Sequence, residues 1–249
     1  MRAIVVLPTY NERDALPLSL AGILRQPGEF RVLVVDDNSP DGTGELADRL
    51  ARENPGRVEV LHRPRKEGLG RAYAEGFARA LADGAELVFQ MDADLSHDPD
   101  SLPALRAPLE RGEADLVLGS RYVPGGGTSG WGLGRRLLSR WGSFYARNLL
   151  RLPLRDLTGG FKGWRRDLLA VVDPQAAGAR GYIFLVETTL RAVRAGARVR
   201  EVPILFTERV EGVSKMTLGV AFEAAWRVPM LALRPPAVKP FVPGGGNSP

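Results

Sequence analysis

The sequence predicts an α/β fold, with a mostly parallel, Rossmann-like sheet flanked by helices. In the first half of the chain, short runs of β-branched residues alternate with longer helical patterns, which is typical of a parallel sheet covered on both faces. Of the 249 residues, 44% are hydrophobic and 25% are charged, so the chain can bury a core of ordinary size. The predicted strands are 3–7, 32–35, 58–61, 87–91 and 116–118, and the predicted helices between them are 12–24, 45–52, 70–82 and 100–110.

The pattern changes after Tyr122. Residues 124–134 are rich in glycine and predict a flexible loop, and a helix (135–152) and a turn (156–161) follow. The sequence then predicts a helix (183–195), a strand (199–205) and a last helix (217–233). The Pro-rich end of the chain, residues 235–249, is expected to be a disordered tail.

Composition limits the chemistry that the chain can carry. The absence of cysteine excludes disulfides, thiolate metal sites and a cysteine nucleophile, so a metal would bind oxygen ligands or one of the two histidines. We find no signal peptide and no uncharged apolar run of the ~18 residues that a membrane span needs, so the cytoplasm is the expected location. The formal net charge of +5 suits anionic partners, although a generic arginine-rich surface explains it equally well.

Acidic residues follow two of the predicted strands. Asp36 and Asp37 end one strand, and Asp92 and Asp94 follow another. Because the carboxyl ends of parallel strands share one edge of the sheet, where such folds bind ligands, we expect these side chains to lie near each other. Carboxylate oxygens suit Mg²⁺ or Mn²⁺, which bind through a few carboxylates and the phosphates of a substrate. Taken singly, each segment is also explained as a turn whose side chains cap the next helix.

Six motifs occur in an order that resembles dolichol-phosphate mannose synthases, a polyprenol-phosphate branch of the family-two glycosyltransferases. The motifs are Pro8-Thr9-Tyr10-Asn11-Glu12, Asp36-Asp37-Asn38-Ser39-Pro40-Asp41-Gly42-Thr43, Asp92-Ala93-Asp94-Leu95-Ser96-His97, Gly119-Ser120-Arg121-Tyr122, Asp156-Leu157-Thr158-Gly159-Gly160-Phe161 and Arg209-x-x-Gly212-x-Ser214-Lys215. The resemblance implies a GT-A glycosyltransferase fold. It divides the chain into a nucleotide-sugar-binding half (1–122), an acceptor-binding half (123–215) and a C-terminal helix (216–234).

The resemblance also implies roles for individual residues. The nucleotide sugar would be bound by Pro8, Tyr10, Glu12, Val35, Asp37, Asp41, Lys66, Gly70, Asp92, Ala93 and Asp94. A divalent metal would be held by Asp94, with Ser96 in a weaker role where some relatives carry Gln. The acceptor phosphate would be bound by Arg121, Asp156, Ser214 and Lys215. The residues expected to act in catalysis are Asp92, Asp94, Arg121, Arg209, Lys215 and Glu187.

Physical chemistry supports these roles. Breaking the bond between a sugar and a diphosphate builds negative charge on the leaving group, which a metal and fixed cationic side chains stabilise. Arg121 and Arg209 suit forked contacts to phosphate oxygens, and Lys215 suits a point charge. A lipid monophosphate is largely ionised at neutral pH, so it needs positioning more than deprotonation. Glu187 lies near the place where many relatives carry a catalytic acid, but a structural helix acid explains it almost equally well.

The predicted helix 135–152 has the pattern of a helix that lies in a membrane interface. At ~100° per residue, an arginine stripe adjoins an aromatic and leucine face. The stripe is Arg136, Arg140, Arg147 and Arg151, and the face is Leu137, Trp141, Phe144, Tyr145, Leu149 and Leu152. A core helix with a solvated arginine edge is the alternative. With Trp226 and Leu231, this helix is expected to place the protein on the cytoplasmic membrane surface, as a peripheral protein or beside a membrane-protein partner.

The predicted reaction is inverting transfer of mannose from GDP-mannose to a polyprenyl (dolichyl or undecaprenyl) phosphate, with Mg²⁺ or Mn²⁺ as the cofactor. The mannosyl part of this prediction rests on the resemblance alone. The alternative among enzymes is the same machinery with another donor, such as UDP-glucose, or with another acceptor. The alternative of another class is a non-catalytic protein that binds nucleotides or lipid phosphates. Nucleic acid is not an expected partner, because it would require one broad basic patch with stacking aromatics.

Overall fold

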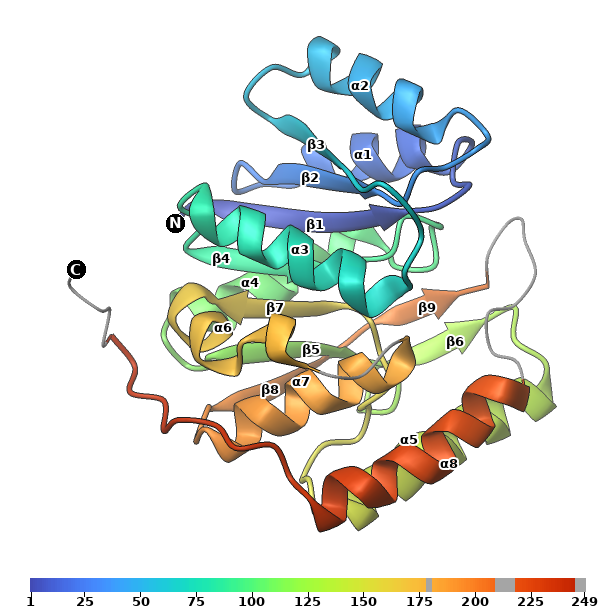
Figure 1. Cartoon of the computed structure of the whole chain (residues 1–249), viewed down its shortest axis with the longest axis vertical. Helices are drawn as coiled ribbons and strands as arrows, with labels where there is room; N and C mark the ends of the chain where they lie inside the picture. The colour runs from blue at the N-terminus through green and yellow to red at the C-terminus, as the bar shows by residue number, and fades with distance from the viewer. Residues whose placement is uncertain (178–180, 209–217, 245–249) are drawn as a thin grey trace.

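The computed structural model describes residues 1–177, 181–208 and 218–244, and its centre is a seven-stranded sheet (Figure 1). The strand order is β3-β2-β1-β4-β7-β5-β8. The strands are β1 (Ala3–Thr9), β2 (Arg31–Asp36), β3 (Val58–His62), β4 (Leu87–Gln90), β5 (Leu116–Ser120), β7 (Lys162–Arg165) and β8 (Val199–Pro203). β7 runs antiparallel to β4 and β5, and the other pairings are parallel. The mostly parallel sheet and its five strands in the first half are confirmed.

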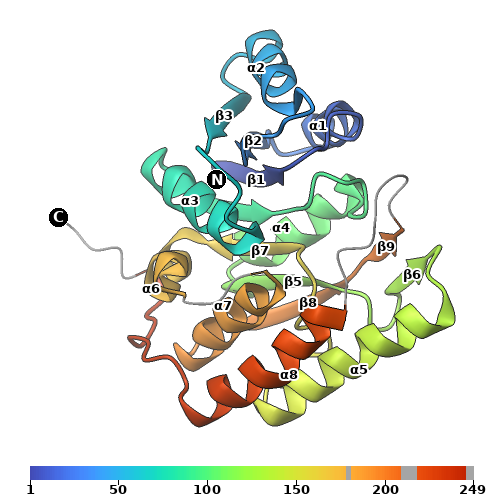
Figure 2. The ribbon, with the colours of Figure 1, turned by 45° about the vertical axis from the view of Figure 1, so that its right-hand side comes forward.

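Helices cover both faces of the sheet, which explains why the strands read as continuous apolar runs (Figure 2). Along β1, Ile4 and Val6 pack into the core on one face, while Val5 and Leu7 pack into the core on the other. The first core includes residues of α3 (Leu69–Ala82), α6 (Arg166–Val172) and α7 (Tyr182–Arg194). The second includes residues of α1 (Leu16–Leu24), α2 (Thr43–Glu53) and α4 (Leu102–Glu110). Because the helices pack on the two faces of the sheet, they leave the ends of the strands uncovered.

Two long helices, α5 (Leu133–Leu149) and α8 (Leu218–Leu233), lie side by side outside these layers (Figures 1 and 2). The Tyr145 hydroxyl of α5 donates a 3.2 Å hydrogen bond to the backbone oxygen of Ala225 in α8. α5 ends before residue 152, the predicted end, because Arg151 adopts a left-handed backbone with φ of 54°. Within the described ranges, none of the helices combines the length and the apolar character that crossing a bilayer requires.

The structure contains strands that the sequence pattern did not predict. β7 and α6 follow the predicted turn at 156–161 without a gap. The segment 124–134, predicted as a flexible loop, contains β6 (Gly127–Ser129), which pairs in parallel with β9 (Leu205–Thr207). The predicted strand 199–205 is therefore divided between two sheets. It divides at Ile204, whose backbone bonds to Ser120 on one side and to Gly127 on the other.

The end of the chain is attached to the domain as far as residue 244. Phe241 is buried, and its backbone N–H donates a 2.7 Å hydrogen bond to the oxygen of Ala195. The backbone N–H of Gly244 donates to the Asp167 carboxylate at 3.2 Å. Residues 235–244, predicted as a disordered tail, form neither helix nor strand but make these contacts, and residues 245–249 lie outside the described residues.

Candidate active site

The carboxyl ends of neighbouring strands bring the predicted acidic segments to one edge of the sheet, as the sequence indicated. Thr9 at the end of β1 lies opposite Asp36 of β2, and Asp36 lies opposite His62 of β3. β4 pairs with the other side of β1, and Asp92 and Asp94 lie in the turn that follows β4 after Met91. Two acidic strand ends therefore flank the end of β1, where parallel sheets bind ligands.

Asp37, the predicted contact for the nucleoside, is held by a buried arginine that follows β3. The Arg63 guanidinium pairs with Asp37 and also contacts Glu67 at 3.1 Å and Glu75 at 3.0 Å. Burial raises the pKa of Asp37, and the ion pair with Arg63 opposes this rise without cancelling it. Sequence reasoning missed Arg63, because a single arginine after a strand has no feature that distinguishes it from surface arginines.

Tyr10 and Lys66 contact each other at the same corner of the sheet. The Lys66 Nζ atom is 3.6 Å from the centre of the Tyr10 ring, a cation–π contact. Both residues were predicted to bind the nucleotide, and the structure brings them together. A base that stacked on this face of Tyr10 would have to displace the Lys66 ammonium.

Other predicted nucleotide-binding residues form the framework of this corner. Asp41 accepts hydrogen bonds from the Thr43 backbone N–H at 3.0 Å and hydroxyl at 2.6 Å, as the turn interpretation expects. Burial alone would raise the pKa of Asp41, but these hydrogen bonds outweigh it and the pKa is lowered. The Glu12 backbone N–H donates to the Thr43 hydroxyl at 3.1 Å, and Pro8 lies opposite Val35 in the sheet. The segments after β1 and β2 are therefore joined.

Gly70, also predicted to bind the nucleotide, lies where α3 packs closely on α7. A Cβ atom at this position would come within 2.9 Å of the Phe184 Cβ. Helix packing therefore accounts for the glycine, and its contact with a nucleotide stays a prediction.

Asp92 and Asp94 have different surroundings after β4. Asp92 Oδ1 accepts a 2.9 Å hydrogen bond from the Tyr73 hydroxyl, and the Asp92 backbone N–H donates to His97 Nδ1 at 3.1 Å. Asp94 is buried, and its Oδ1 accepts hydrogen bonds from the Ser96 backbone N–H at 3.1 Å and the Ser96 hydroxyl at 2.6 Å. The Asp92 carboxylate is thus oriented by Tyr73 of α3, and the Asp94 carboxylate by Ser96 of the same turn.

This turn fits a divalent cation that binds mainly through its substrate. Among the described residues, no three His, Asp or Glu side chains form a cluster that could enclose a metal. A site with one or two carboxylates completed by phosphate oxygens and waters needs no such cluster. The Ser96 hydroxyl donates to Asp94 and so orients the predicted ligand. The backbone of this turn is also anchored, because the Ser19 hydroxyl donates a 2.8 Å bond to the oxygen of Ala93.

His97 supports the turn from a buried position. Its ring centre lies 5.0 Å from that of Phe161 and 5.1 Å from that of Phe206. Burial lowers the pKa of His97, although Asp92 and Asp94 act in the opposite direction. A neutral ring can accept a hydrogen bond from the Asp92 backbone N–H at Nδ1, and this bond holds the backbone of Asp92 in place after the end of β4.

Arg121 and Asp156, both predicted to act on the acceptor phosphate, form a buried bidentate ion pair. The Arg121 Nε and Nη2 atoms each lie 2.7 Å from an Asp156 carboxylate oxygen, and Nη2 also donates to the Thr158 hydroxyl at 2.9 Å. Burial alone would raise the pKa of Asp156, but Arg121 outweighs it and the pKa lies below its ordinary value. The centres of the rings around the guanidinium lie 5.1 Å (Tyr122), 5.5 Å (Trp131) and 5.4 Å (Phe206) away. Asp156 therefore orients Arg121, since a carboxylate would repel a phosphate.

Glu187 pairs with an arginine of its own helix. Its Oε1 atom lies 3.0 Å from Arg191 Nη2, one turn further along α7, and both side chains are largely buried. These contacts fit the structural-acid interpretation of Glu187. The remaining predicted residues, Arg209, Ser214 and Lys215, lie outside the described residues.

Lys162 is a buried lysine that sequence reasoning missed, although it directly follows the motif that ends at Phe161. Its Nζ atom donates to the Leu185 backbone oxygen at 2.7 Å and to the Thr189 hydroxyl at 2.8 Å. Burial lowers the pKa of Lys162 to about 7, although Asp156 opposes this fall. Lys162 therefore connects β7 to α7 through hydrogen bonds that the pattern KGWR does not reveal.

Replacing Lys162 by Met is expected to change how the free energy of unfolding depends on pH. The unfolded lysine titrates near 10.5 and the folded one near 7, so between these values the unfolded state binds more protons. The contribution of Lys162 to the free energy of unfolding therefore rises with pH in this window. Below the window, where Lys162 is charged in both states, the full cost of burying the charge destabilises the folded state. Relative to the variant, the wild type should gain on the order of 1 kcal/mol per pH unit within the window. Urea melts of both proteins across the window would measure this gain, and parallel pH profiles would contradict it.

Comparison with known proteins places this chain among sugar transferases. The family model of glycosyl transferase family 2 matches residues 4–172. The polyprenol monophosphomannose synthase of Mycolicibacterium smegmatis is 45% identical over 233 residues, which cover 94% of this chain and 88% of that protein. The undecaprenyl-phosphate mannosyltransferase of Micrococcus luteus is 47% identical over 228 residues, which cover 92% of this chain and 93% of that protein.

Solved structures resemble the fold at lower sequence identity. A mannosyltransferase from Pyrobaculum calidifontis in complex with GDP-Man and Mn²⁺ gives a TM-score of 0.63 at 21% identity, over 96% of this chain and 66% of that one. Glucosyl-3-phosphoglycerate synthase from Mycobacterium tuberculosis, in complex with Mn²⁺ and UDP, gives a TM-score of 0.64 at 22% identity, over 93% of this chain and 78% of that one. These two likenesses concern the fold alone.

Proposed function

The chain belongs to glycosyl transferase family 2 and has the GT-A fold, and from this premise we propose that it transfers mannose from GDP-mannose to a polyprenyl phosphate. The observation that carries the proposal is the identity, over most of the chain, to a polyprenol monophosphomannose synthase and an undecaprenyl-phosphate mannosyltransferase. The acidic strand ends and the buried Arg121–Asp156 pair support the same reaction.

In the proposed reaction, an oxygen of the acceptor phosphate attacks C1 of the mannose on the face opposite the diphosphate. The new C1–O bond forms as the bond from C1 to the diphosphate breaks, and GDP leaves with the electron pair. The acceptor phosphate is largely ionised at neutral pH, so the step requires no general base. The pairing of Glu187 with Arg191 agrees with a reaction that does not need this carboxylate as a base.

The described residues would divide the work between the two substrates. Asp37 would accept hydrogen bonds from the nucleoside, against which Tyr10 would stack. Asp94, oriented by Ser96, would hold Mg²⁺ or Mn²⁺, which supplies a Lewis acid for the charge on the departing diphosphate, and Asp92 would contact the ribose or the sugar. Arg121, oriented by its carboxylate partner, would present its guanidinium to the acceptor phosphate.

The test is incubation of the purified protein and Mn²⁺ with a panel of radiolabelled nucleotide sugars and a polyprenyl phosphate, followed by organic extraction. We expect label in the organic phase only with GDP-mannose and only when the acceptor is present. Label transferred from UDP-glucose instead would reassign the donor. If GDP bound but no donor gave extractable label, the non-catalytic alternative would replace the proposed reaction.

We also propose that the protein works on the cytoplasmic surface of the membrane, alone or beside a membrane-protein partner. A polyprenyl chain stays in the bilayer, so the enzyme must reach its phosphate at the surface. The side-by-side helices α5 and α8 expose large apolar side chains, among them Trp141 (59% exposed) and Trp226 (73% exposed). Exposed aromatic residues on helices of this kind are typical of proteins that lie on membranes.

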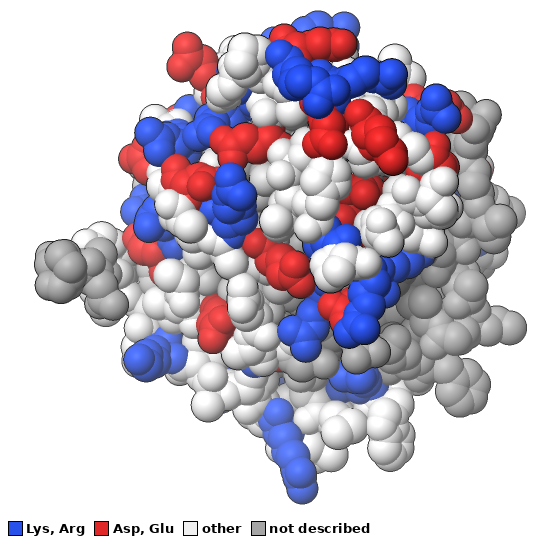
Figure 3. Space-filling view, turned by 45° about the horizontal axis from the view of Figure 1, so that its top comes forward, with Lys and Arg blue, Asp and Glu red and all other residues white. Residues whose placement is uncertain are grey.

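Nucleic acid is not part of the proposed function. On the face shown in Figure 3, basic and acidic side chains of the described residues are interspersed. A nucleic-acid site would require a broad basic surface along the path of the phosphates. The arginines of the described site are instead largely engaged by carboxylates, as Arg63 and Arg121 are.

A further inference from the structure

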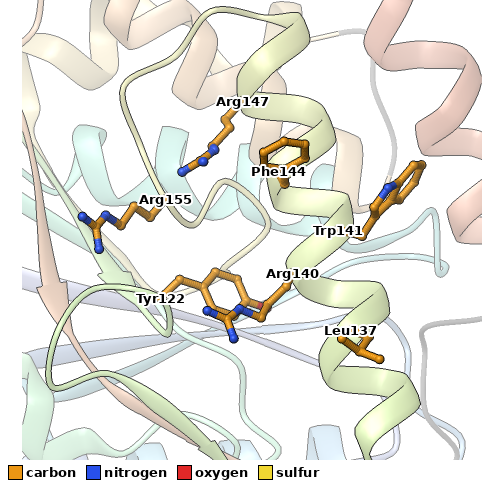
Figure 4. A pocket seen from close by; sticks show the side chains of 7 residues that line it. All are labelled: Tyr122, Leu137, Arg140, Trp141, Phe144, Arg147 and Arg155. Atoms are coloured by element: carbon orange, nitrogen blue, oxygen red, sulfur yellow. The ribbon is translucent and has the colours of Figure 1, made fainter.

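A groove of about 600 Å³ runs along one side of α5, between this helix and the segments that carry Tyr122 and Arg155 (Figure 4). Arg140 and Arg147 extend from the helix toward those segments, and Trp141, which also lines the groove, points away from them. Three guanidinium groups therefore line one groove. It lies beside the buried pair of Arg121 and Asp156 but does not include it.

The positive charge of this groove is not balanced by acids in the described part of the chain. Arg140, Arg147 and Arg155 have no carboxylate within ion-pair distance there, whereas Arg135 on the same helix pairs with Glu208 at 2.8 Å. Residues 116–155 contain seven arginines and no Asp or Glu. The Glu201 carboxylate lies near the backbone of Arg155. Its two oxygens accept hydrogen bonds from the backbone N–H groups of residues 155 and 156 at 2.8 and 2.9 Å, so it pairs with backbone and not with the guanidinium groups of the groove. The groove is therefore suited to an anion.

Apolar side chains distinguish this groove from a site for a free anion or for nucleic acid. Leu137 is 67% exposed and Phe144 is 53% exposed, and both line the groove beside the arginines. The two helices also expose Leu133 of α5 (76% exposed) and Leu233 of α8 (83% exposed). A soluble anion would leave these side chains in water. A lipid would cover the apolar side chains with acyl chain and the arginines with headgroup phosphate.

We infer that this groove binds the phosphodiester headgroup of an anionic membrane phospholipid, with Leu137, Trp141 and Phe144 entering the acyl boundary. The phospholipid is not a substrate, so this site goes beyond the proposed transfer reaction. The inference rests on the proposed association with the membrane. Its consequence is that α5 is held in one orientation on the bilayer, with Arg121 and the acceptor site facing the lipid surface.

Vesicle binding by the full chain tests the inference. The variant Arg140→Gln/Arg147→Gln/Arg155→Gln should bind vesicles that contain phosphatidylglycerol on the order of 100-fold more weakly, because each cation near an anionic surface adds about fivefold to partitioning. Binding to pure phosphatidylcholine vesicles should not change. The difference between variant and wild type on anionic vesicles should shrink as salt is raised.

Two further variants show whether the effect belongs to the groove. Arg25→Gln/Arg49→Gln/Arg52→Gln removes the same charge from exposed positions just after α1 and on α2, at the opposite end of the molecule, and should bind anionic vesicles nearly as the wild type does. Trp141→Ser/Phe144→Ser removes apolar area and should weaken binding to both kinds of vesicle. Equal losses in the two arginine variants would overturn the inference, because net charge alone would then explain the binding.

Other occupants of the groove give different results. If inorganic phosphate released the protein from anionic vesicles at constant ionic strength, the groove would be a site for free phosphate and the headgroup assignment would be wrong. If the groove variant lost affinity for a single-stranded oligonucleotide but not for vesicles, the occupant would be nucleic acid. Mannosyl transfer to a short, water-soluble prenyl phosphate should be unchanged in the groove variant. Failure of the wild type in that assay would contradict the proposed function without affecting the vesicle result.

Discussion

Replacing Asp94 by Asn is expected to reduce the transferase rate by about 1000-fold, which corresponds to roughly 4 kcal/mol of transition-state stabilisation. The amide keeps the size of the side chain, and its oxygen can still accept hydrogen bonds from Ser96, as Asp94 Oδ1 does. It lacks the negative charge that a divalent cation requires, so charge on the departing diphosphate would go unbalanced. Initial rates with Mn²⁺ in the extraction assay would measure the loss.

A second measurement distinguishes lost metal binding from general damage. In the wild type, GDP should raise the melting temperature more with Mn²⁺ than without it, because a ligand stabilises the state that binds it. The Asp94→Asn variant should lose this metal-dependent increment while keeping its melting temperature without ligand. Asp100→Asn, at an exposed carboxylate that contacts Gln26, is the matched control and should retain both rate and increment. An Asp94→Asn enzyme with wild-type turnover and metal dependence would rule out Asp94 as the ligand.

The parts of the fold that the sequence predicted are those where burial dictates residue type. β1, β2 and β4 have core on both faces, so each reads as an apolar run, and a parallel sheet then brings their carboxyl ends to one edge. β7 was not predicted, because its residues Lys162 and Trp164 are explained by hydrogen-bond partners that are distant in the sequence. Lys162 bonds to α7, and Trp164 Nε1 donates to Gln90 of β4 at 3.1 Å. Such partners are distant in sequence, so a local pattern does not reveal them.

The same reason separates the predicted from the missed residues of the candidate site. Asp37 and Asp92 follow strands and belong to motifs, so their positions could be read from the chain. Their partners Arg63, which follows β3, and Tyr73 of α3 have no local signature of these roles. Gly70 shows a further limit of local patterns, since the close contact of this glycine with a helix more than a hundred residues later could not be read from its motif, and its contact with a nucleotide stays a prediction.

Replacing Asp156 by Ala is expected to destabilise the protein by about 3–5 kcal/mol, because Arg121 would remain buried without its bidentate partner. For a domain of this size, that loss lowers the melting temperature by roughly 6–20 °C. The control is Asp83→Ala, which breaks the partly exposed pair with Arg79 at 2.8 Å and should cost at most about 1 kcal/mol. Thermal melts at neutral pH would compare the variants.

The pH dependence of stability provides an independent test of the same pair. The pKa of Asp156 is lowered below its ordinary value of 3.8, so its stabilising effect is complete above that value and is lost as pH falls through the folded pKa. Wild type and Asp156→Ala should therefore converge in stability at acid pH, whereas wild type and Asp83→Ala should differ little at any pH.

The double variant Arg121→Met/Asp156→Leu should recover much of the stability that Asp156→Ala loses, since apolar side chains can replace a buried pair at little cost, but it should remain inactive. Recovery of stability without recovery of transfer would show that the pair acts on the substrate. A double variant that regained transfer would assign Arg121 to the framework instead.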